Sequence, residues 1–591
     1  MKDKWDLTKL VKNRKEYESG IERIKALAKE IEGMKGHILD DENTLLKYVK
    51  TDEELSLLQE RLYVYALIKY YDDMGNAENQ ADKEAMSKLL SDVSSSLSFV
   101  TPELFKHDLN YVKSLINKKE ELKKYEFNFE EVYRYQEHFL SDAEEKIMSS
   151  LSPTFSTSRN AFNALDNVDI SLGSIKDEDG NEVELTQSNY QRFIQSKNRE
   201  VRKSAFEKLY AYFKGRINTI SALYAGVVKQ DAFVTQIRKY DSILERALFG
   251  DMVSPEAYKT LIKVVDKHLD LIKRYYRLKG KCLGIDEMHM YDTGVNISES
   301  KNKEIPYEEG KKIILDALSI LGEDYIKNIS YLFDSNCVDV YPKKNKKSGA
   351  YEIATYGVDP YVSTNYEGTI DSVSTVAHEM GHAMHSYYSN KNNPFIYAEY
   401  PIILAEIAST VNETILSDYL LKHTDDEEEK IYYLVEFLDG FKGTIYRQTM
   451  FAEFEYLIHD MYERGESLTT EVICNTYKDL VKKHFEDAVH VDDEISYEWA
   501  RIPHFYTPFY VYKYATGLIS ALCIVDKLKK EEGFNEKYIK DFLSRGGSDY
   551  PLNILKGIGI DITDESTLDS AFDMFEDKLN ELESLVMKRR K

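Results

Sequence analysis

Helical periodicity over nearly the whole chain is the feature that most limits the fold. Only 11 prolines interrupt 591 residues, and proline disrupts a helix interior more strongly than any other residue. Apolar residues that recur every three or four positions mark one buried face of an α-helix. One such stripe comprises Leu55, Leu58, Leu62, Tyr65 and Ile68. The sequence therefore predicts a mainly α protein.

Two helix starts can be placed from local signals. Thr51 and Glu54 have the spacing of a capping box, so a helix is expected to begin there. Ser254 followed by Pro255 is typical of an N-cap and the first helical position, and the apolar stripe behind them continues to Gly280. We expect one helix over that stretch.

One region departs from the helical pattern. The segment "CVDVYPKKNKKSGAYEIATYGVDPYVSTNYEG" has short β-branched and aromatic runs, separated by lysines and by the turn signal "GVDP". It predicts a small antiparallel sheet directly before a histidine-rich stretch. We interpret the lysine-rich run 343–347 as a solvated loop, with contact to a substrate carboxylate as the alternative.

Length and charge limit the class of protein. A chain of 591 residues exceeds what one ordinary core organises, so several lobes or one large helical body are expected. The formal charge of -25 repels phosphate backbones and anionic membranes, which argues against nucleic-acid and membrane partners. The four cysteines show no paired spacing, so neither a disulfide scaffold nor a thiolate zinc site is indicated.

The expected location follows from the start of the chain. The opening "MKDKWDLTKLVKNRKEYESG" is charged throughout and lacks the apolar core of a signal peptide. No stretch approaches the roughly 20 apolar residues that span a bilayer. We therefore expect a cytoplasmic protein; no sequence feature indicates an oligomeric state.

The segment "AHEMGHAMH" holds the strongest chemical signal. His378 and His382 lie four residues apart, so on a helix both imidazoles project from one face and can share a metal ion. Glu379 between them would take a proton from a metal-bound water and later deliver it to a leaving amine. His385 lies about 10.5 Å along the helix axis from His378, too far to join one tetrahedral ion. A solvated helix face is the competing interpretation.

A third ligand must come from elsewhere. A second apolar helix is expected from about Pro401, and Glu406 lies in its hydrophobic run "IILAEIA". A carboxylate buried there needs a partner, which a zinc ion, or an Arg or Lys across the core, would supply. Glu413, two turns on, is either a supporting residue or a surface residue.

These motifs together resemble oligoendopeptidase F, a branch of the thimet-oligopeptidase family of zinc metallopeptidases. Glu406 follows His382 by 24 residues, as in that family. The similarity covers nearly the whole chain and includes "WDL", "LSPTFSTSRNAF", "SGAYEIATYGVDPYV", "TIDSVSTVAHEMGHAMHSYY" and "IPHFYTPFYVYKYATG".

The resemblance implies a zinc ion, one per chain, held by His378, His382 and Glu406, with Glu379 as general base and acid. It also implies a helical body around a deep channel that admits short peptides, with an N-terminal lobe over 1–195 and a catalytic domain over 196–591. The same site could accept cobalt or manganese. A peptide adding as a strand to the small sheet is expected to use an edge around residues 361–366.

Hydrolysis also needs a donor for the negative oxygen of the tetrahedral intermediate. The resemblance suggests His504 and a tyrosine that follows it. Tyr510 and Tyr514 would share one helix face and Tyr512 the opposite one, so one register excludes the other; comparison with the family favours Tyr512.

The preferred function is therefore a zinc endopeptidase that cleaves oligopeptides. Exopeptidase action with the same chemistry, as a peptidyl-dipeptidase or carboxypeptidase, is the alternative. An inactive peptide-binding protein is a third possibility, although the residues required for the chemistry are all present.

Overall fold

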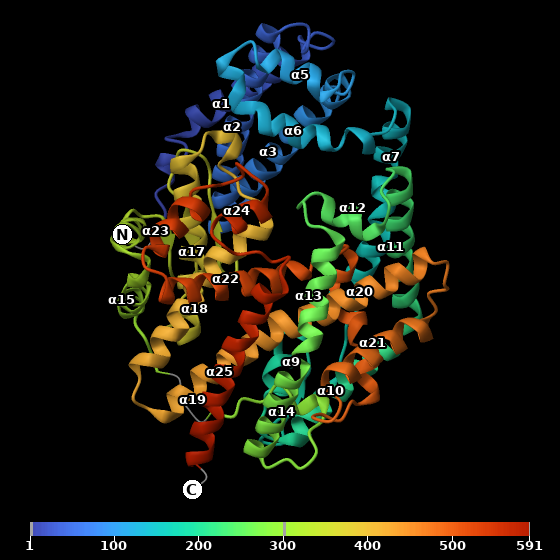
Figure 1. Cartoon of the computed structure of the whole chain (residues 1–591), viewed down its shortest axis with the longest axis vertical. Helices are drawn as coiled ribbons and strands as arrows, with labels where there is room; N and C mark the ends of the chain where they lie inside the picture. Colours follow the sequence, from blue (N-terminus) through green and yellow to red (C-terminus); the bar gives the residue numbers. More distant parts are fainter. Residues whose placement is uncertain (1–3, 299–302, 590–591) are drawn as a thin grey trace. The chain divides into compact units, whose positions relative to one another are not determined.

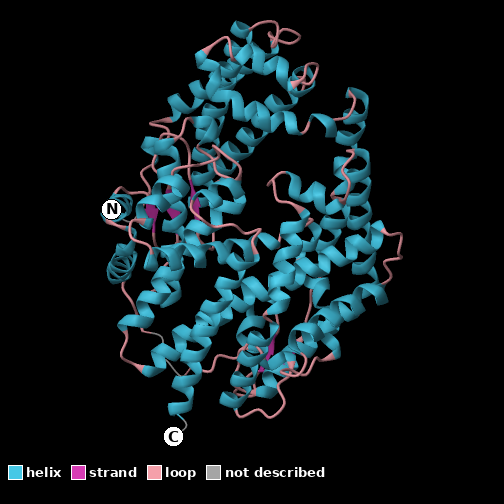
Figure 2. Ribbon diagram, viewed as in Figure 1, coloured by secondary structure: helices cyan, strands magenta, loops and turns pink. Residues whose placement is uncertain are grey.

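The computed structural model describes residues 4–298 and 303–589. Helices make up most of it, and the strands are few and short (Figure 2). The prediction of a mainly α protein is confirmed. By contacts the chain divides into two compact units, whose described residues are 4–142, 303–416 and 524–560 for unit 1, and 143–298, 417–523 and 561–589 for unit 2.

Unit 1 contains the histidine-rich segment and the sheet before it. Its strands are β3 (Val338–Asp339), β4 (Tyr351–Ile353) and β5 (Tyr361–Ser363). Its helices are α1 (Arg14–Glu32), α2 (Glu42–Asp72), α3 (Ala77–Ser96), α4 (Val100–Leu104), α5 (Leu109–Ile116), α6 (Glu126–Arg134), α15 (Tyr307–Ala317), α16 (Glu323–Asp334), α17 (Ile370–Asn392), α23 (Phe534–Tyr538) and α24 (Pro551–Gly557), with the first part of α18 (Ile402–His423) and the end of α22 (Tyr512–Lys530).

Unit 2 is helical apart from one hairpin of β1 (Ser174–Lys176) and β2 (Glu182–Glu184). Its α-helices are α7 (Asp142–Phe155), α8 (Thr157–Asn167), α9 (Gln187–Ile194), α10 (Arg199–Lys214), α11 (Ile217–Ile237), α12 (Ile243–Phe249), α13 (Pro255–Lys267), α14 (Leu269–Leu283), α19 (Glu427–Phe441), α20 (Arg447–Glu463), α21 (Thr470–Phe485) and α25 (Glu565–Arg589). Two 3-10 segments, η8 (Asp493–Arg501) and η9 (Pro503–Tyr506), precede α22.

The N-terminal helices and the small sheet share one core within unit 1. Helices α1, α2 and α3 pack against one another (Figure 1), and Tyr361 of β5 belongs to their hydrophobic cluster. The Trp5 indole donates to the carbonyl of Val362 at 2.8 Å, and the Tyr361 hydroxyl donates to the carbonyl of Asp6 at 2.8 Å. These contacts fix the chain start to the sheet. The division into an N-terminal lobe (1–195) and a catalytic domain (196–591) stays a prediction. The deep channel also stays a prediction.

The sheet lies beside α17, as expected, but it is not wholly antiparallel. β5 is the central strand and pairs in parallel with β3 and antiparallel with β4. The prediction of a peptide-binding edge around residues 361–366 is therefore wrong, because both sides of β5 already carry strand hydrogen bonds. β4, an outer strand of this sheet, contacts α17.

The lysine-rich run before β4 is not simply a solvated loop. Lys346 is buried, and its ammonium group donates to the carbonyls of Asp339, Tyr341 and Thr364 at 2.6–3.1 Å. The Lys347 ammonium nitrogen lies 3.9 Å from the centroid of the Tyr71 ring. Backbone carbonyls surround the Lys346 ammonium group, and the Tyr71 ring lies against the Lys347 ammonium group. The run is therefore packed against the sheet and its neighbours.

Helix boundaries also differ from the sequence predictions. α2 begins at Glu42 rather than near residue 51, because the Asp41 side chain accepts from the amides at 43 and 44 and caps an earlier start. Ser254 caps α13 as predicted, by accepting from the amide of Ala257. The single helix expected from there to Gly280 is two helices, interrupted at His268.

Candidate metal centre

Helix α17 presents the two histidines of the HExxH motif. It starts where the Thr369 side chain accepts from the amide of Ser372 and caps the first turn. His378 and His382 follow one turn apart on the same face. Their Nε2 atoms lie 3.2 Å apart, and their rings are inclined by 77°.

Glu406 on α18 completes the group. Its Oε2 atom lies 3.6 Å from His378 Nε2 and 3.8 Å from His382 Nε2. Zinc ligands at about 2.0–2.2 Å in tetrahedral geometry are about 3.3–3.5 Å from one another. The three donor atoms therefore fit one ion with small side-chain adjustments, and their chemistry, two imidazoles and one carboxylate, is that of a catalytic zinc site.

Gly381 explains how α17 and α18 approach closely enough. A Cβ added to Gly381 would lie 2.5 Å from the Ser409 Cα and 2.8 Å from the Ala408 carbonyl oxygen. Both are backbone atoms of α18, so only glycine permits this contact. A close helix crossing, rather than a bound ligand, accounts for this glycine.

Glu406 is less buried than its apolar context predicts. Its side chain is 48% exposed, whereas Ile403, Leu404 and Ile407 beside it are buried. The helix turns the apolar residues toward the core and Glu406 away from it. The expectation that burial alone requires a partner for this carboxylate is therefore wrong, although the carboxylate does face both histidines.

Residues behind the histidines hold them in place. His378 Nδ1 lies 3.1 Å from Glu413 Oε2, so a proton on Nδ1 can be donated to Glu413, which leaves Nε2 as the nitrogen that can bind a metal. Asn412 donates to the carbonyl of Ala377 at 3.1 Å and accepts from the Tyr325 hydroxyl at 3.0 Å. Glu413 therefore contacts a histidine of the centre, as the supporting role would require, although its side chain is 37% exposed.

Burial and charge shift the protonation of this group. Burial lowers the pKa of His378, but the hydrogen bond and charge of Glu413 outweigh it and raise that pKa to about 9. Burial, together with the charge of His378, lowers the pKa of His382 to about 3, so its Nε2 is available as a lone pair at neutral pH. Burial raises the pKa of Glu379 to about 7.

Two further buried groups lie near this part of α17. Glu352 on β4 interacts electrostatically with Glu379, and burial raises its pKa to about 8. This acid is not among the residues predicted from the sequence, although a glutamate between Tyr351 and Ile353 in a strand is a usable signal. His385 is fully buried and stacks on Tyr400 with ring centroids 3.7 Å apart, so it is a core residue and not a ligand.

The predicted oxyanion donors belong to unit 2. The Tyr514 hydroxyl lies 3.3 Å from His504 Nε2, and the Tyr510 and Tyr514 rings meet edge to face at 5.5 Å. Tyr512 is only 1% exposed and donates to Asp251 at 3.2 Å. His504 therefore lies next to Tyr510 and Tyr514. Tyr512, the tyrosine that the resemblance favours as oxyanion donor, is instead a core residue.

A buried glutamate, Glu455, holds the backbone turn just before Tyr510. Phe509 has a φ of 54°, which bulky residues rarely adopt. Its amide donates to Glu455 Oε1 at 2.7 Å, and the Glu455 side chain is fully buried. Burial raises the pKa of Glu455 to about 8. This contact stabilises the turn that separates Tyr510 from the helix beginning at Tyr512, and the sequence offered no signal for it.

Two histidines and a glutamate around one point, with a second glutamate beside the first histidine, define the donor set of HExxH metallopeptidases. The chain belongs to peptidase family M3: the model of that family matches residues 192–574, and the oligopeptidase F model matches residues 103–171.

Individual relatives agree with this assignment. Oligopeptidase PepF of Bacillus subtilis is 38% identical over 587 residues, covering 99% of this chain and 88% of the relative. The crystal structure of a peptidase from Chlamydophila abortus is 35% identical, with a TM-score of 0.92 over 99% of this chain and 98% of that one. Oligoendopeptidase-F from Enterococcus faecium is 32% identical, with a TM-score of 0.76 over 97% and 99%.

The preferred function from the sequence is thereby confirmed. The chain is a metalloendopeptidase that cleaves oligopeptides, and neither the exopeptidase nor the inactive binding protein is favoured. Across residues 4–298 and 303–589, no helix combines the length and the apolar character needed to cross a bilayer.

Proposed function

We propose that the chain hydrolyses internal bonds of short peptides with one zinc ion per chain, held by His378, His382 and Glu406. The observation that carries this proposal is the convergence of three donor atoms within 3.2–3.8 Å of one another. A zinc ion held there would supply Lewis-acid polarisation of a water molecule and of the scissile carbonyl. The same donors could also hold cobalt or manganese, and geometry and availability select among these metals.

Glu379 is the proposed general base and acid. It directly follows His378 on α17, and its side chain is 7% exposed. In this role its carboxylate removes a proton from the attacking water and then protonates the leaving amine, so no covalent enzyme intermediate is needed. Glu413, in contact with His378 Nδ1, would hold the ring so that Nε2 could bind the ion.

Two further roles are proposed for the substrate. β4 is the strand to which an extended peptide would add, since it is an outer strand that contacts α17. His504, with Tyr514 rather than Tyr512, is proposed as donor to the reacting carbonyl oxygen, which the contact of Tyr514 with His504 supports. A cytoplasmic location and the exclusion of nucleic-acid and membrane partners stay predictions.

Glu379→Gln tests the chemical assignment. The variant should retain zinc, because Glu379 is not a ligand, and lose about 10²–10⁴-fold in turnover of an internally quenched peptide of about ten residues. Wild-type protein should lose activity to a chelator and regain it with zinc, and product masses should show an internal cut. A Glu379→Gln variant as active as wild type would refute the role of Glu379. Activity unaffected by complete metal removal would refute the metal assignment.

A further inference from the structure

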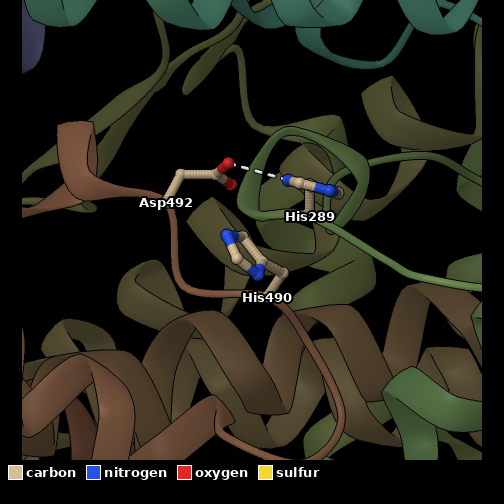
Figure 3. Close-up of side chains that lie close together, drawn as sticks. All are labelled: His289, His490 and Asp492. Atoms are coloured by element: carbon tan, nitrogen blue, oxygen red, sulfur yellow. Dashed lines mark hydrogen bonds and ion pairs between the residues drawn. The ribbon is translucent and has the colours of Figure 1, made fainter.

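Unit 2 contains a second group of metal-ligating side chains: His289, His490 and Asp492 (Figure 3). His289 lies in the turn between α14 and the short 3-10 segment Met290–Asp292. His490 and Asp492 lie in the extended link between α21 and η8. None of the three belongs to the peptidase motif.

Backbone pairing brings the two histidines together. His289 and His490 form a parallel β-bridge, and the His490 amide donates to the Met288 carbonyl at 2.6 Å. Residues paired across a bridge project to the same side, and so do residues two apart on an extended segment. His490 and Asp492 therefore share the face on which His289 stands. The imidazole centroids are 4.6 Å apart, and one donor atom from each of the three residues lies within 4.8 Å of the others.

The carboxylate is already held in position. Asp492 Oδ2 accepts from the Met290 amide at 2.9 Å, and Oδ1 lies 2.7 Å from His289 Nδ1. Figure 3 shows the Asp492 carboxylate directed at the His289 ring, with the His490 ring below both. Little side-chain freedom would be lost when these groups bind an ion, so the site is largely preorganised.

The surroundings favour a cation and allow it to enter. The His490 side chain is 51% exposed, and its Nδ1 lies 3.6 Å from a carboxylate oxygen of Glu287. A cavity of about 410 Å³ next to it is lined by His490 and by four acidic residues, against one lysine, Lys482. The acidic residues are Asp286, Glu287, Glu486 and Asp487. An excess of negative charge at a recess raises the local concentration of cations.

We propose that His289, His490 and Asp492 bind a second divalent metal ion, of the class of Co²⁺, Ni²⁺, Cu²⁺ or Zn²⁺. Two imidazole nitrogens and one carboxylate suit these ions, whereas Ca²⁺ and Mg²⁺ require mostly oxygen ligands. For His289 Nδ1 to bind the ion, the proton between Nδ1 and Asp492 moves to Nε2 of the same ring or leaves to water, and the 2.7 Å contact then opens to about 3.3 Å around the ion. The ion joins the turn after α14 to the link before η8 and stabilises both segments.

The competing interpretation is a plain hydrogen bond between His289 and Asp492, and the chain contains a matched control for it. His37 Nδ1 lies 2.7 Å from Asp40 Oδ2, the same contact on an exposed surface. This pair is not among the groups of three or more candidate ligands found in the described residues. A His–Asp pair alone should bind a transition ion far more weakly than three converging ligands.

Cobalt binding by the full-length chain tests the proposal. A background variant, His378→Ala with His382→Ala, removes two ligands of the peptidase centre, and its cobalt content is measured by equilibrium dialysis after chelator treatment. We expect one ion per chain in this background. Adding His490→Ala should weaken that binding by at least about 10-fold, whereas adding His37→Ala should leave it unchanged.

Two outcomes would overturn the second site: a background variant that binds no cobalt, or one whose cobalt affinity is unchanged by His490→Ala. Thermal unfolding gives an independent measurement. The melting temperature of the background variant should rise with cobalt concentration, and this rise should disappear in His490→Ala. Because His490 is half exposed, the metal-free His490→Ala variant should still fold normally. Circular dichroism checks this.

Discussion

Replacing Gly381 by alanine should damage the metal centre more than it damages the fold. The new Cβ would lie 2.5 Å from the Ser409 Cα, whereas carbon atoms in contact prefer about 3.5–4.0 Å. The obstacle is the α18 backbone, which cannot rotate away as a side chain could. α17 and α18 must therefore separate locally by about 1 Å.

The two consequences differ in size. Overpacking of this kind costs about 1–3 kcal/mol, and alanine returns about 1 kcal/mol of helix propensity, so the net loss of stability is about 0–2 kcal/mol. Glu406 lies one turn before Ser409 on α18, so the separation also moves its carboxylate away from both histidines. A 1 Å displacement at a reacting centre can reduce activity about 10²-fold.

The assay compares kcat/KM on a quenched peptide, bound zinc and urea unfolding for Gly381→Ala and for Gly440→Ala. Gly440 is the matched control, because it lies in α19 and a Cβ there would meet nothing within 4 Å. Gly440→Ala should keep full activity and gain up to about 1 kcal/mol. If Gly381→Ala keeps wild-type activity and zinc content, the close helix contact does not position Glu406.

Other substitutions test the residues around the centre. Glu413→Gln should lower zinc affinity about 10–100-fold in a chelator competition, because His378 loses its charged acceptor; an unchanged affinity would contradict this role. Tyr514→Phe should lower kcat about 10²–10³-fold with little change in KM, if its hydroxyl stabilises the transition state. Tyr512→Phe should instead lower the free energy of unfolding by about 1 kcal/mol through loss of its bond to Asp251, with kcat nearly unchanged. The reverse pattern for the two tyrosines would restore Tyr512 as the donor.

The sequence predicted the helices better than their ends. Periodicity over Leu55–Ile68 identified α2 because a buried apolar stripe is a property of the local sequence. The predicted start of α2 is wrong because the segment contains two capping signals, one at Asp41 and one at Thr51. The Asp41 side chain accepts from the amides at 43 and 44, so the helix begins at Glu42. His268 divides α13 from α14 although the apolar pattern continues through it. Element type was therefore predictable, and boundaries depended on which local hydrogen bonds form.

Long-range pairing was not predictable from the same patterns. The strand around Val362 was recognised, but its central place between β3 and β4 depends on residues distant in the chain. The lysine-rich run predicts a solvated loop, yet the surrounding fold supplies three carbonyls to the ammonium group of Lys346. Such partners appear only once the chain is folded.

The sequence by itself determined the class of chemistry, because the spacing of His378, Glu379 and His382 on one helix fixes their relative directions through helix geometry alone. Only the tertiary structure decided which distant residues meet them. It brought Glu406 within 4 Å of both histidines, placed Glu413 behind His378, and put Tyr514 rather than Tyr512 beside His504. The physical reason is that spacing along one helix is set by covalent geometry, whereas contacts between segments are set by packing, as at Gly381, where two backbones touch.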